Sequence, residues 1–289
     1  MQHRFHSVLF APGNKPDILR KLPRSAPHVA VLDLEDAVPD THKDEARRVT
    51  NEVGAELCAA DGPAVFVRIN AVVSPHFVDD FAGIPQGARG IAVPKLESAE
   101  HVRVVTEQLT SSGHDGLAIM AGIETGVGVH RAAEILDHPQ VASVYFGAED
   151  FIADMGGVRT RSNDEVLHAR SSVVLAARVT GTAAIDQIVA DFGDDERFTE
   201  EAEFAKTLGF DGKLCIHPAQ VALANAAFVP TDDEIEHAKR LVTAYDNALA
   251  AGNASIAFEG QMIDEALVRR ARSIVGQTKE TDHGKEQST

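Results

Sequence analysis

Short apolar runs recur along the chain, and most of them are continuously apolar rather than alternating with polar residues. Runs of this kind are typical of strands that are buried on both faces of a parallel sheet. We therefore predict eight strands, at residues 7–10, 29–34, 64–69, 90–96, 117–124, 142–150, 181–186 and 212–218.

Helical patterns fill most of the gaps between these runs. Residues 41–60 place Ala46, Val49, Val53 and Leu57 on one face, and similar patterns predict helices over residues 98–113, 194–209 and 231–249. Strands that alternate with helices in this way predict a (β/α)₈ TIM barrel, with a doubly wound sheet as the alternative.

The length of the chain exceeds what a barrel needs. A barrel of this kind takes about 250 residues, so we assign residues 1–250 to a TIM-barrel catalytic domain. Residues 251–276 then form a C-terminal helical extension that acts as a lid or arm. From residue 277 the sequence is polar and without period, which predicts a disordered tail over residues 277–289.

Charge and composition exclude several classes of protein. The formal net charge of −17 opposes nucleic acid or an anionic membrane as the main partner, because binding to phosphates is driven by basic surface. No run approaches the roughly 18 apolar residues of a spanning helix, and no signal peptide is evident, which predicts a cytoplasmic protein. Cys58 and Cys215 belong to no metal or redox spacing and are expected in the core.

One basic segment interrupts this acidic chain. Residues 15–24 carry Lys15, Arg20, Lys21 and Arg24 against a single acid, Asp17. A charge run by itself is usually a solvated helix face, and a site for an anionic ligand is the alternative.

Nearly every predicted strand ends in polar or charged side chains or is followed directly by them. In a barrel the carboxyl ends of the strands meet at one face, where active sites lie. We therefore expect a catalytic mouth at this face. The residues at these positions are Asp33, Glu35, Asp36, Arg68, Asn70, Lys95, Glu124, Glu149, Asp150, Asp186 and His217.

Converging carboxylates repel one another unless a cation neutralises them, and Mg²⁺ prefers carboxylate oxygens and water. Glu124 and Asp150 end consecutive strands and are the pair that we expect to bind a metal. The alternative is that each carboxylate caps the helix that follows it. Asp33, Glu35 and Asp36 would orient Arg68 or metal-bound water, and Asp33 and Glu35 are predicted as catalytic residues in this sense. Arg68 either clamps a substrate carboxylate or enolate, or forms a structural ion pair.

Two further motifs give weaker signals. His217, before a proline, is read as structural rather than catalytic. Gly126 and Gly128 follow a strand as in a dinucleotide fingerprint, but Arg131 replaces the third glycine. We expect these glycines to let a small anionic ligand approach a helix N-terminus beside Glu124, and a nucleotide-binding module is the alternative.

Eight segments in this order resemble the HpcH/HpaI aldolase and citrate lyase β-subunit superfamily, in its CoA-ester lyase branch. They are LFAPGNKPDILRK, VLDLEDAVPDTHKDEAR, VRIN, VPKLES, IETGVG, YFGAEDF, LGFDGKLCIHPAQV and GQMIDEALVRRA. The resemblance spans nearly the whole chain. It implies a (β/α)₈ barrel that assembles as a homotrimer or hexamer, in which the C-terminal extension covers the site of a neighbouring subunit.

The resemblance also implies roles for single residues. It makes Mg²⁺, or Mn²⁺ in its place, the cofactor and a CoA thioester the substrate, with Glu124 and Asp150 as the metal ligands. Arg68 and Asp264 would be catalytic, Arg68 as the clamp and Asp264 as a general acid/base from the lid. The implied substrate- and CoA-binding residues are Phe10, Ala11, Lys15, Lys21, Arg68, Glu124, Glu149, Asp150, Ile216 and His217.

The predicted reaction follows from these roles. A Mg²⁺-dependent lyase would cleave or form a 3-hydroxyacyl-CoA, such as malyl-CoA or citramalyl-CoA, with an acyl-CoA and a 2-oxoacid as the other partners. Two alternatives share the same motifs. One is a citrate lyase β subunit acting on a carrier-protein citryl thioester within a complex, and the other is a malyl-CoA thioesterase.

Overall fold

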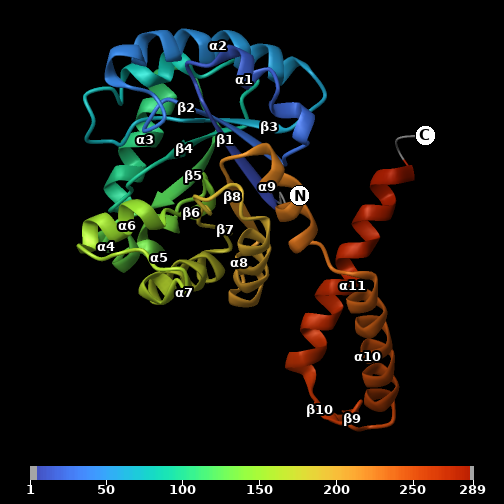
Figure 1. The fold of residues 1–289 in the computed structure, drawn as a ribbon. Coiled ribbons are helices and arrows are strands. Elements are labelled where there is room, and N and C mark those ends of the chain that lie inside the picture. The colour runs from blue at the N-terminus through green and yellow to red at the C-terminus, as the bar shows by residue number, and fades with distance from the viewer. Residues whose placement is uncertain (1–4, 287–289) are drawn as a thin grey trace. The chain divides into compact units, whose positions relative to one another are not determined.

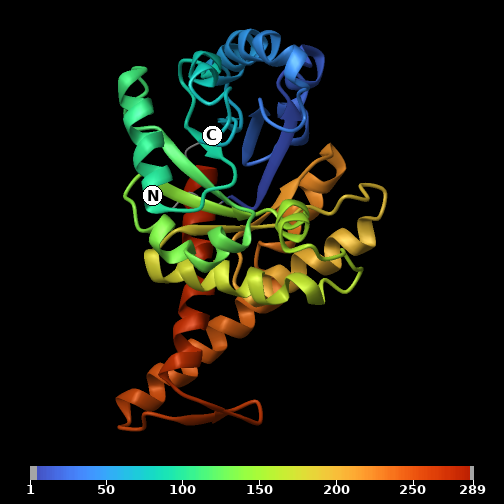
Figure 2. The same ribbon diagram turned by 90° about the vertical axis from the view of Figure 1, so that its left-hand side faces the viewer.

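The computed structural model describes residues 5–286, with side chains as far as residue 276. Eight parallel strands close into a barrel in sequence order, because the last strand pairs with the first. This confirms the predicted (β/α)₈ barrel, and Figures 1 and 2 show helices surrounding these strands. The strands are β1 (Ser7–Pro12), β2 (Val29–Asp33), β3 (Ala64–Arg68), β4 (Gly90–Val93), β5 (Ala118–Ile123), β6 (Val141–Phe146), β7 (Ala183–Asp186) and β8 (Gly212–Cys215).

Helices and short 3₁₀ turns connect the strands. The helices of the barrel are α1 (Pro16–Leu19), α2 (Lys43–Ala59), α3 (Ala99–Ser111), α4 (Gly126–His130), α5 (Ala132–Leu136), α6 (Ala148–Met155), α7 (Asp164–Thr180), α8 (Asp195–Leu208) and α9 (Pro218–Ala227). The 3₁₀ turns are η1 (Leu22–Ser25), η2 (Asp40–His42) and η3 (Asp79–Gly83). No helix in the described part of the chain is long and apolar enough to span a membrane.

Each strand contributes to two separate apolar layers. Alternate residues point to opposite faces of a strand, so Val31 lies inside the barrel while Leu32 packs outward against the helices. The same alternation places Phe66 and Tyr145 inside. This parity decides whether a polar residue at the end of a strand faces the barrel axis or the helices.

The chain divides into two compact units, Met1–Phe228 and Val229–Thr289. The second unit contains α10 (Asp232–Ala250), the hairpin β9 (Ile256–Phe258) and β10 (Gln261–Ile263), and α11 (Glu265–Glu286). The boundary between the two units, after Phe228, lies earlier in the chain than the predicted boundary at residue 250. The reason is that Leu241 and Tyr245 of α10 pack with Val268 of α11.

The predicted disordered tail begins inside α11, since the helical backbone continues to Glu286. Residues 287–289 lie outside the described residues. A capping box at Thr231 starts α10, where the sequence predicts a helix over residues 231–249. The Thr231 hydroxyl accepts from the Glu234 N–H, and the Glu234 carboxylate accepts from the Thr231 N–H.

Candidate active site

Strand parity brings several of the predicted residues to one end of the barrel. Asp33 and Arg68 are partners in register at the ends of β2 and β3, and each lies two positions beyond an inward-facing residue, Val31 and Phe66 respectively. Glu124, two residues beyond Gly122 of β5, continues the same inward face and is buried. Together with Glu35, Lys95 and Asp150, which the ion pairs below join to them, these residues are called the mouth.

Arg68 is held by two acids of the mouth. Its Nε and Nη2 donate to the two oxygens of Asp33 at 2.7 and 2.6 Å. Its Nη1 lies 2.9 Å from Oε2 of Glu35, without the alignment of a hydrogen bond. The guanidinium also lies over the ring of Phe10, 5.1 Å from its centroid. Arg68 is therefore a structural partner of Asp33, and its role as a clamp for a substrate anion stays a prediction.

Asp33 also organises the loop that follows β2. Its carboxylate accepts from the N–H groups of Glu35 and Ala37, at 2.9 and 3.2 Å. Lys43, a buried lysine that sequence reasoning missed, donates to the carbonyl oxygens of Leu34 and Glu35 at 2.6 and 2.8 Å. The backbone of this acidic loop is thus held by hydrogen bonds to the Asp33 carboxylate and to the Lys43 ammonium group, which restrict its conformation.

Glu124 occupies a space that two glycines leave open. A Cβ on Gly122 would lie 2.6 Å from its Oε1, and a Cβ on Gly147 would lie 2.7 Å from its Cγ. The Tyr145 hydroxyl donates to Oε1 of Glu124 inside the barrel. Tyr145 was not predicted from the sequence. Its position in β6, two residues before Gly147 and therefore on the same face of the strand, is a signal that could have identified it.

Glu124 and Asp150 form a site with a shortage of positive charge. The pKa of Glu124 is raised to about 8, chiefly by burial and in addition by the charge of Glu35 and the hydrogen bond with Asp150, while the Tyr145 hydrogen bond and Arg68 oppose the shift. Burial likewise raises the pKa of Glu35, although Arg68 and Lys95 oppose the shift. Such carboxylates are neutralised by a proton or by a cation.

This donor set fits Mg²⁺. No three His, Cys, Asp or Glu side chains of the described residues gather into a ready-made metal cage. A hard divalent ion that keeps several waters or substrate oxygens needs only one or two protein carboxylates. Glu124 and Asp150, brought together at the mouth, supply that number.

The predicted CoA-binding residues lie around β1 and the segment after it. Phe10 faces inward, whereas Ala11 is buried in the outer layer, so only its backbone could meet a ligand. Lys15 and Lys21 are exposed, and neither side chain has a partner among the described residues. Arg20 of the same basic run is paired with Glu56, to which it donates two hydrogen bonds of 2.8 Å.

Ile216 and His217 follow β8 as predicted. Both of their N–H groups donate to Oε1 of Gln220, at 2.9 and 3.3 Å. His217 caps α9 and stacks on Phe192, with ring centroids 5.0 Å apart. His217 thus has the structural role that its sequence context favours, and both side chains are exposed.

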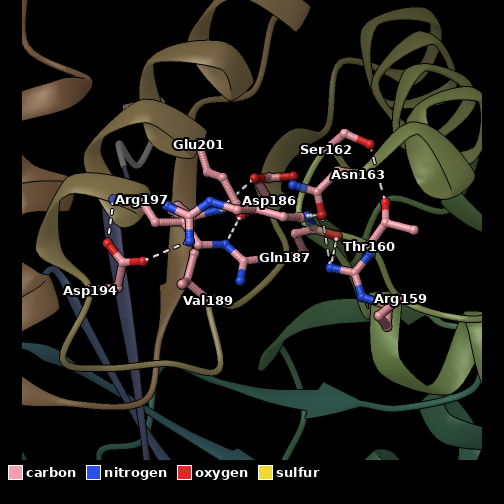
Figure 3. Close-up of polar contacts among 12 residues, drawn as sticks. Arg159, Thr160, Ser162, Asn163, Asp186, Gln187, Val189, Asp194, Arg197 and Glu201 are labelled. Atoms are coloured by element: carbon pink, nitrogen blue, oxygen red, sulfur yellow. Dashed lines mark hydrogen bonds and ion pairs between the residues drawn. The ribbon is translucent and has the colours of Figure 1, made fainter.

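Asp186 does not reach the mouth, contrary to expectation. Ile185 faces inward, so Asp186 faces the helices, where it binds Arg170 at 2.9 and 3.0 Å and Lys213 at 2.7 Å. Figure 3 shows the wider polar network, in which Gln187 contacts Asn163 and Glu201. This end of β7 therefore stabilises the packing of α7 and α8.

The same network reaches α6 through Arg159. This side chain donates to Asn163 at 2.9 Å (Figure 3) and to Glu149 at 3.0 Å. Glu149 is exposed and turned to Arg159, whereas its neighbour Asp150 lies 3.6 Å from Lys95. Of this acidic pair, Asp150 is the one joined to the mouth.

Contrary to expectation, the glycine-rich segment after Glu124 is not open to an anion. The Gly126 N–H donates to Asp154 at 2.8 Å, and the Gly128 N–H donates to the Thr125 hydroxyl at 3.0 Å. Because both donors are occupied by side chains of the chain itself, this segment favours neither an anion site nor a dinucleotide site.

Asp264 belongs to the second unit, where it precedes α11 and is exposed. Its Oδ1 accepts from the N–H groups of Ala266 and Leu267, at 3.0 and 3.3 Å. Its Oδ2 has no hydrogen-bond partner among the described residues. One oxygen of this carboxylate is therefore available for proton transfer.

Hollows of about 500 Å³ occur elsewhere on the barrel. One, of about 510 Å³, is lined by Gly62, Ala64 and Ala118 at the start of β3 and β5, the end of the barrel opposite the mouth. Another, of about 500 Å³, lies over Val129, Met155 and other apolar residues of α4 to α7. Neither gathers titratable groups as the mouth does, so chemistry rather than volume identifies the candidate site.

Comparison with known proteins gives a family match and several similar chains. The family model for HpcH/HpaI aldolase/citrate lyase matches residues 6–218. The citrate lyase subunit beta-like protein of Deinococcus radiodurans is 49% identical over 93% of this chain and 95% of its own. The L-malyl-CoA/beta-methylmalyl-CoA lyase of Rhodobacter capsulatus is 32% identical over 93% of each chain.

A solved structure extends the likeness to the whole fold. The CitE protein of Mycobacterium tuberculosis, in complex with magnesium, acetoacetate and coenzyme A, aligns with a TM-score of 0.79 and 30% identity. The alignment covers 95% of this chain and 98% of that one.

Proposed function

Because the chain belongs to the HpcH/HpaI aldolase/citrate lyase family, we propose that it is a Mg²⁺-dependent CoA-ester lyase. The reaction is cleavage or formation of a 3-hydroxyacyl-CoA such as malyl-CoA or citramalyl-CoA, with an acyl-CoA and a 2-oxoacid as the partners. The observation that carries this proposal is the meeting of Glu124 and Asp150 with the Arg68 guanidinium at the mouth. Acidic and basic groups so placed suit a substrate that chelates a cation and develops negative charge.

Glu124 and Asp150 are the residues that would hold Mg²⁺. When bound, the ion supplies a Lewis acid for the 2-oxo or hydroxyl oxygen and a template for the carboxylate of the substrate. The Tyr145 hydrogen bond fixes one oxygen of Glu124 and thereby orients its carboxyl group. Magnesium in the related CitE complex supports this assignment.

Arg68 is proposed to stabilise the enolate of the thioester. Breaking the carbon–carbon bond leaves negative charge on the thioester oxygen, and preorganised donors aimed at that oxygen lower the barrier. Asp33 fixes the guanidinium through two short hydrogen bonds, so the Nη1 donors hold one direction. Asp33 therefore acts through Arg68, and Glu35 acts through both Arg68 and Lys95.

The exposed lysines after β1 are proposed to bind the phosphates of CoA. Lys15 and Lys21 are unpartnered among the described residues, in a protein whose net charge of −17 otherwise repels anions. Phe10 faces inward and the backbone of Ala11 follows it, so the chain passes from the mouth end of β1 directly into this basic segment. Ile216 and His217, exposed after the neighbouring strand β8, complete the proposed CoA-binding surface.

Asp264 is proposed as the general acid/base that protonates the enolate, or removes a methyl proton in the reverse direction. Its exposed carboxylate keeps one oxygen without a partner among the described residues. We further propose that a second copy of the chain receives this residue in a homotrimer or hexamer. Light scattering of the purified protein measures that assembly.

A second function is favoured by the 49% identity to a citrate lyase subunit beta-like protein. In that case the thioester is borne by a carrier protein, and the chain acts only within a complex. The carboxylates and Arg68 of the mouth would serve the same bond cleavage.

Cleavage assays separate these functions. The protein is incubated with malyl-CoA and, in parallel, citramalyl-CoA, with Mg²⁺ or EDTA, and the products are identified by chromatography. A stand-alone lyase releases acetyl-CoA and a 2-oxoacid only with Mg²⁺. Free CoA together with the intact hydroxyacid would instead show a thioesterase. Absence of any product, followed by activity on a carrier-bound citryl thioester, would replace the lyase by the carrier-dependent subunit.

A further inference from the structure

Lys95 has an unusual backbone at the end of β4. Its φ of +52° lies in the left-handed region, which side chains with a Cβ rarely adopt. The next N–H, of Leu96, donates to the carbonyl oxygen of Gly122 at 3.0 Å and ties this turn to β5. Strained residues of this kind cluster where a side chain must be presented in one direction. Glycine would satisfy the turn, but the position carries an ammonium group instead.

The ammonium group of Lys95 is only partly used by the protein. It donates to Oε1 of Glu35 at 2.7 Å, and it lies 3.6 Å from oxygens of Asp36 and Asp150, beyond hydrogen-bond distance. An ammonium group has three N–H donors. Among the described residues, one of these donors has a hydrogen-bond partner, and the side chain remains 31% exposed.

Two structural lysines of the same barrel differ from Lys95 in this respect. Lys43 is buried and makes three hydrogen bonds, to Leu34, Glu35 and Asn70. Lys213 is fully buried between Asp186 and Glu201. A lysine that serves only the fold is thus enclosed by its acceptors here, whereas Lys95 retains donors that face solvent.

The balance of charge at the mouth gives these donors a use. Among the described residues, two cationic side chains, Arg68 and Lys95, are shared by the carboxylates of the mouth and of the neighbouring Asp36. The carboxylates of the mouth are those of Asp33, Glu35, Glu124 and Asp150. Arg68 is largely engaged by Asp33. An incoming carboxylate is repelled by such a set unless a cation with free donors meets it. Burial lowers the pKa of Lys95, but the hydrogen bond and charge of Glu35 outweigh it and hold that pKa above its ordinary value.

We propose that Lys95 is a further substrate-binding residue, whose free N–H donors bind the carboxylate of the 2-oxoacid beside Glu124 and Asp150. Glu35 holds the ammonium group, and the left-handed backbone aims it at the mouth. This inference rests on the proposed function, because it takes the 2-oxoacid as the ligand. It adds a contact that neither Arg68 nor the metal ligands supply.

Calorimetry of the full-length protein tests the role of Lys95. Wild type, Lys95→Met and Lys95→Gly are titrated first with MgCl₂ and then, at saturating Mg²⁺, with pyruvate, glyoxylate or oxaloacetate. Both variants remove the ammonium group, and Lys95→Gly also relieves the backbone strain, so it keeps the test valid if Lys95→Met folds poorly. Loss of a charged hydrogen bond weakens 2-oxoacid binding about 10- to 100-fold. Loss of a positive charge beside Asp150 leaves Mg²⁺ affinity equal or higher.

Weaker 2-oxoacid binding together with equal or higher Mg²⁺ affinity is the result that this role of Lys95 predicts. Propylammonium chloride added to Lys95→Gly is expected to restore part of the 2-oxoacid affinity. Lys239→Met is the matched control, because Lys239 is exposed and pairs with Glu236 at the same 2.7 Å, and it should bind both ligands as the wild type does.

Two results would overturn the inference while leaving the proposed function intact. One is 2-oxoacid binding by both Lys95 variants within twofold of the wild type. The other is weaker Mg²⁺ binding in Lys95→Gly alongside weaker 2-oxoacid binding, which would show that Lys95 only holds the carboxylates in place. If the wild type itself bound none of the three 2-oxoacids with Mg²⁺, the proposed function would fail together with the inference.

Discussion

Replacing Glu124 by glutamine is expected to end metal-dependent activity and yet stabilise the metal-free protein at alkaline pH. The carboxyl of Glu124 is 2% exposed, and burial raises its pKa to about 8 from an ordinary value of 4.5. Glutamine has the same shape, accepts the Tyr145 hydrogen bond and carries no charge to desolvate. The variant therefore removes the cost of an ionised carboxylate inside the barrel.

The sign and size of the effect follow from linkage between protonation and folding. Below pH 4.5 Glu124 is protonated in the folded and the unfolded states, so it contributes no penalty. Between pH 4.5 and about 8 the folded state keeps a proton that the unfolded state has released, so stability falls as pH rises. At about 1.4 kcal/mol per pKa unit, the full penalty above pH 8 is at most about 5 kcal/mol.

Urea unfolding in EDTA, followed by circular dichroism at pH 5 and pH 9, measures this difference. The variant should exceed the wild type by several kcal/mol at pH 9 and by less than about 1 kcal/mol at pH 5. Glu45→Gln is the control, because Glu45 is exposed on α2 and its replacement should change stability by less than about 0.5 kcal/mol. Added Mg²⁺ should stabilise the wild type and leave Glu124→Gln unchanged.

Equal stability of Glu124→Gln and wild type at pH 9 would refute the reasoning, because it would mean that the buried carboxylate carries no electrostatic cost. Retention of Mg²⁺-dependent activity by the variant would separately refute its assignment as a metal ligand.

Three other substitutions test single features of the structure. Gly147→Ala places a Cβ 2.7 Å from Cγ of Glu124 and should lower activity about 10- to 100-fold, whereas Gly62→Ala, with nothing within 4 Å, should leave it unchanged in the same assay. Asp186→Asn leaves two buried cations short of a partner and should cost about 3–5 kcal/mol in urea unfolding of the barrel; a loss below 1 kcal/mol would contradict that role. Thr231→Ala removes a cap of α10 and should cost about 1 kcal/mol, and an unchanged melting curve of the second unit would contradict it.

The barrel and most of its mouth could be predicted because they depend on local pattern. Continuously apolar runs indicated strands buried on both faces, and the closed order of eight strands then fixed one face for their polar ends. Glu124, Arg68 and Asp33 follow from this argument, since each ends a strand with inward parity.

Other features could not be predicted from the residues at the ends of the strands. They depend on which face of the strand a residue lies on, on its backbone angles, or on how helices pack. Asp186 also ends a strand, but its parity turns it to the helices, where Arg170 and Lys213 neutralise it. The left-handed backbone of Lys95 has no sequence signal, because the residue is not glycine. The boundary between the units was misplaced because the apolar face of α10 fits a barrel helix as well as it fits α11.

The most direct test of a Mg²⁺-dependent CoA-ester lyase is mass spectrometry of the reverse reaction. The protein is incubated with acetyl-CoA or propionyl-CoA and pyruvate, glyoxylate or other 2-oxoacids, with Mg²⁺ or with EDTA. The account predicts a new hydroxyacyl-CoA, with the summed mass of the acyl-CoA and the 2-oxoacid, that forms with Mg²⁺ and disappears with EDTA. A hydroxyacyl-CoA that forms equally in EDTA, or no new thioester with any pair, would contradict it.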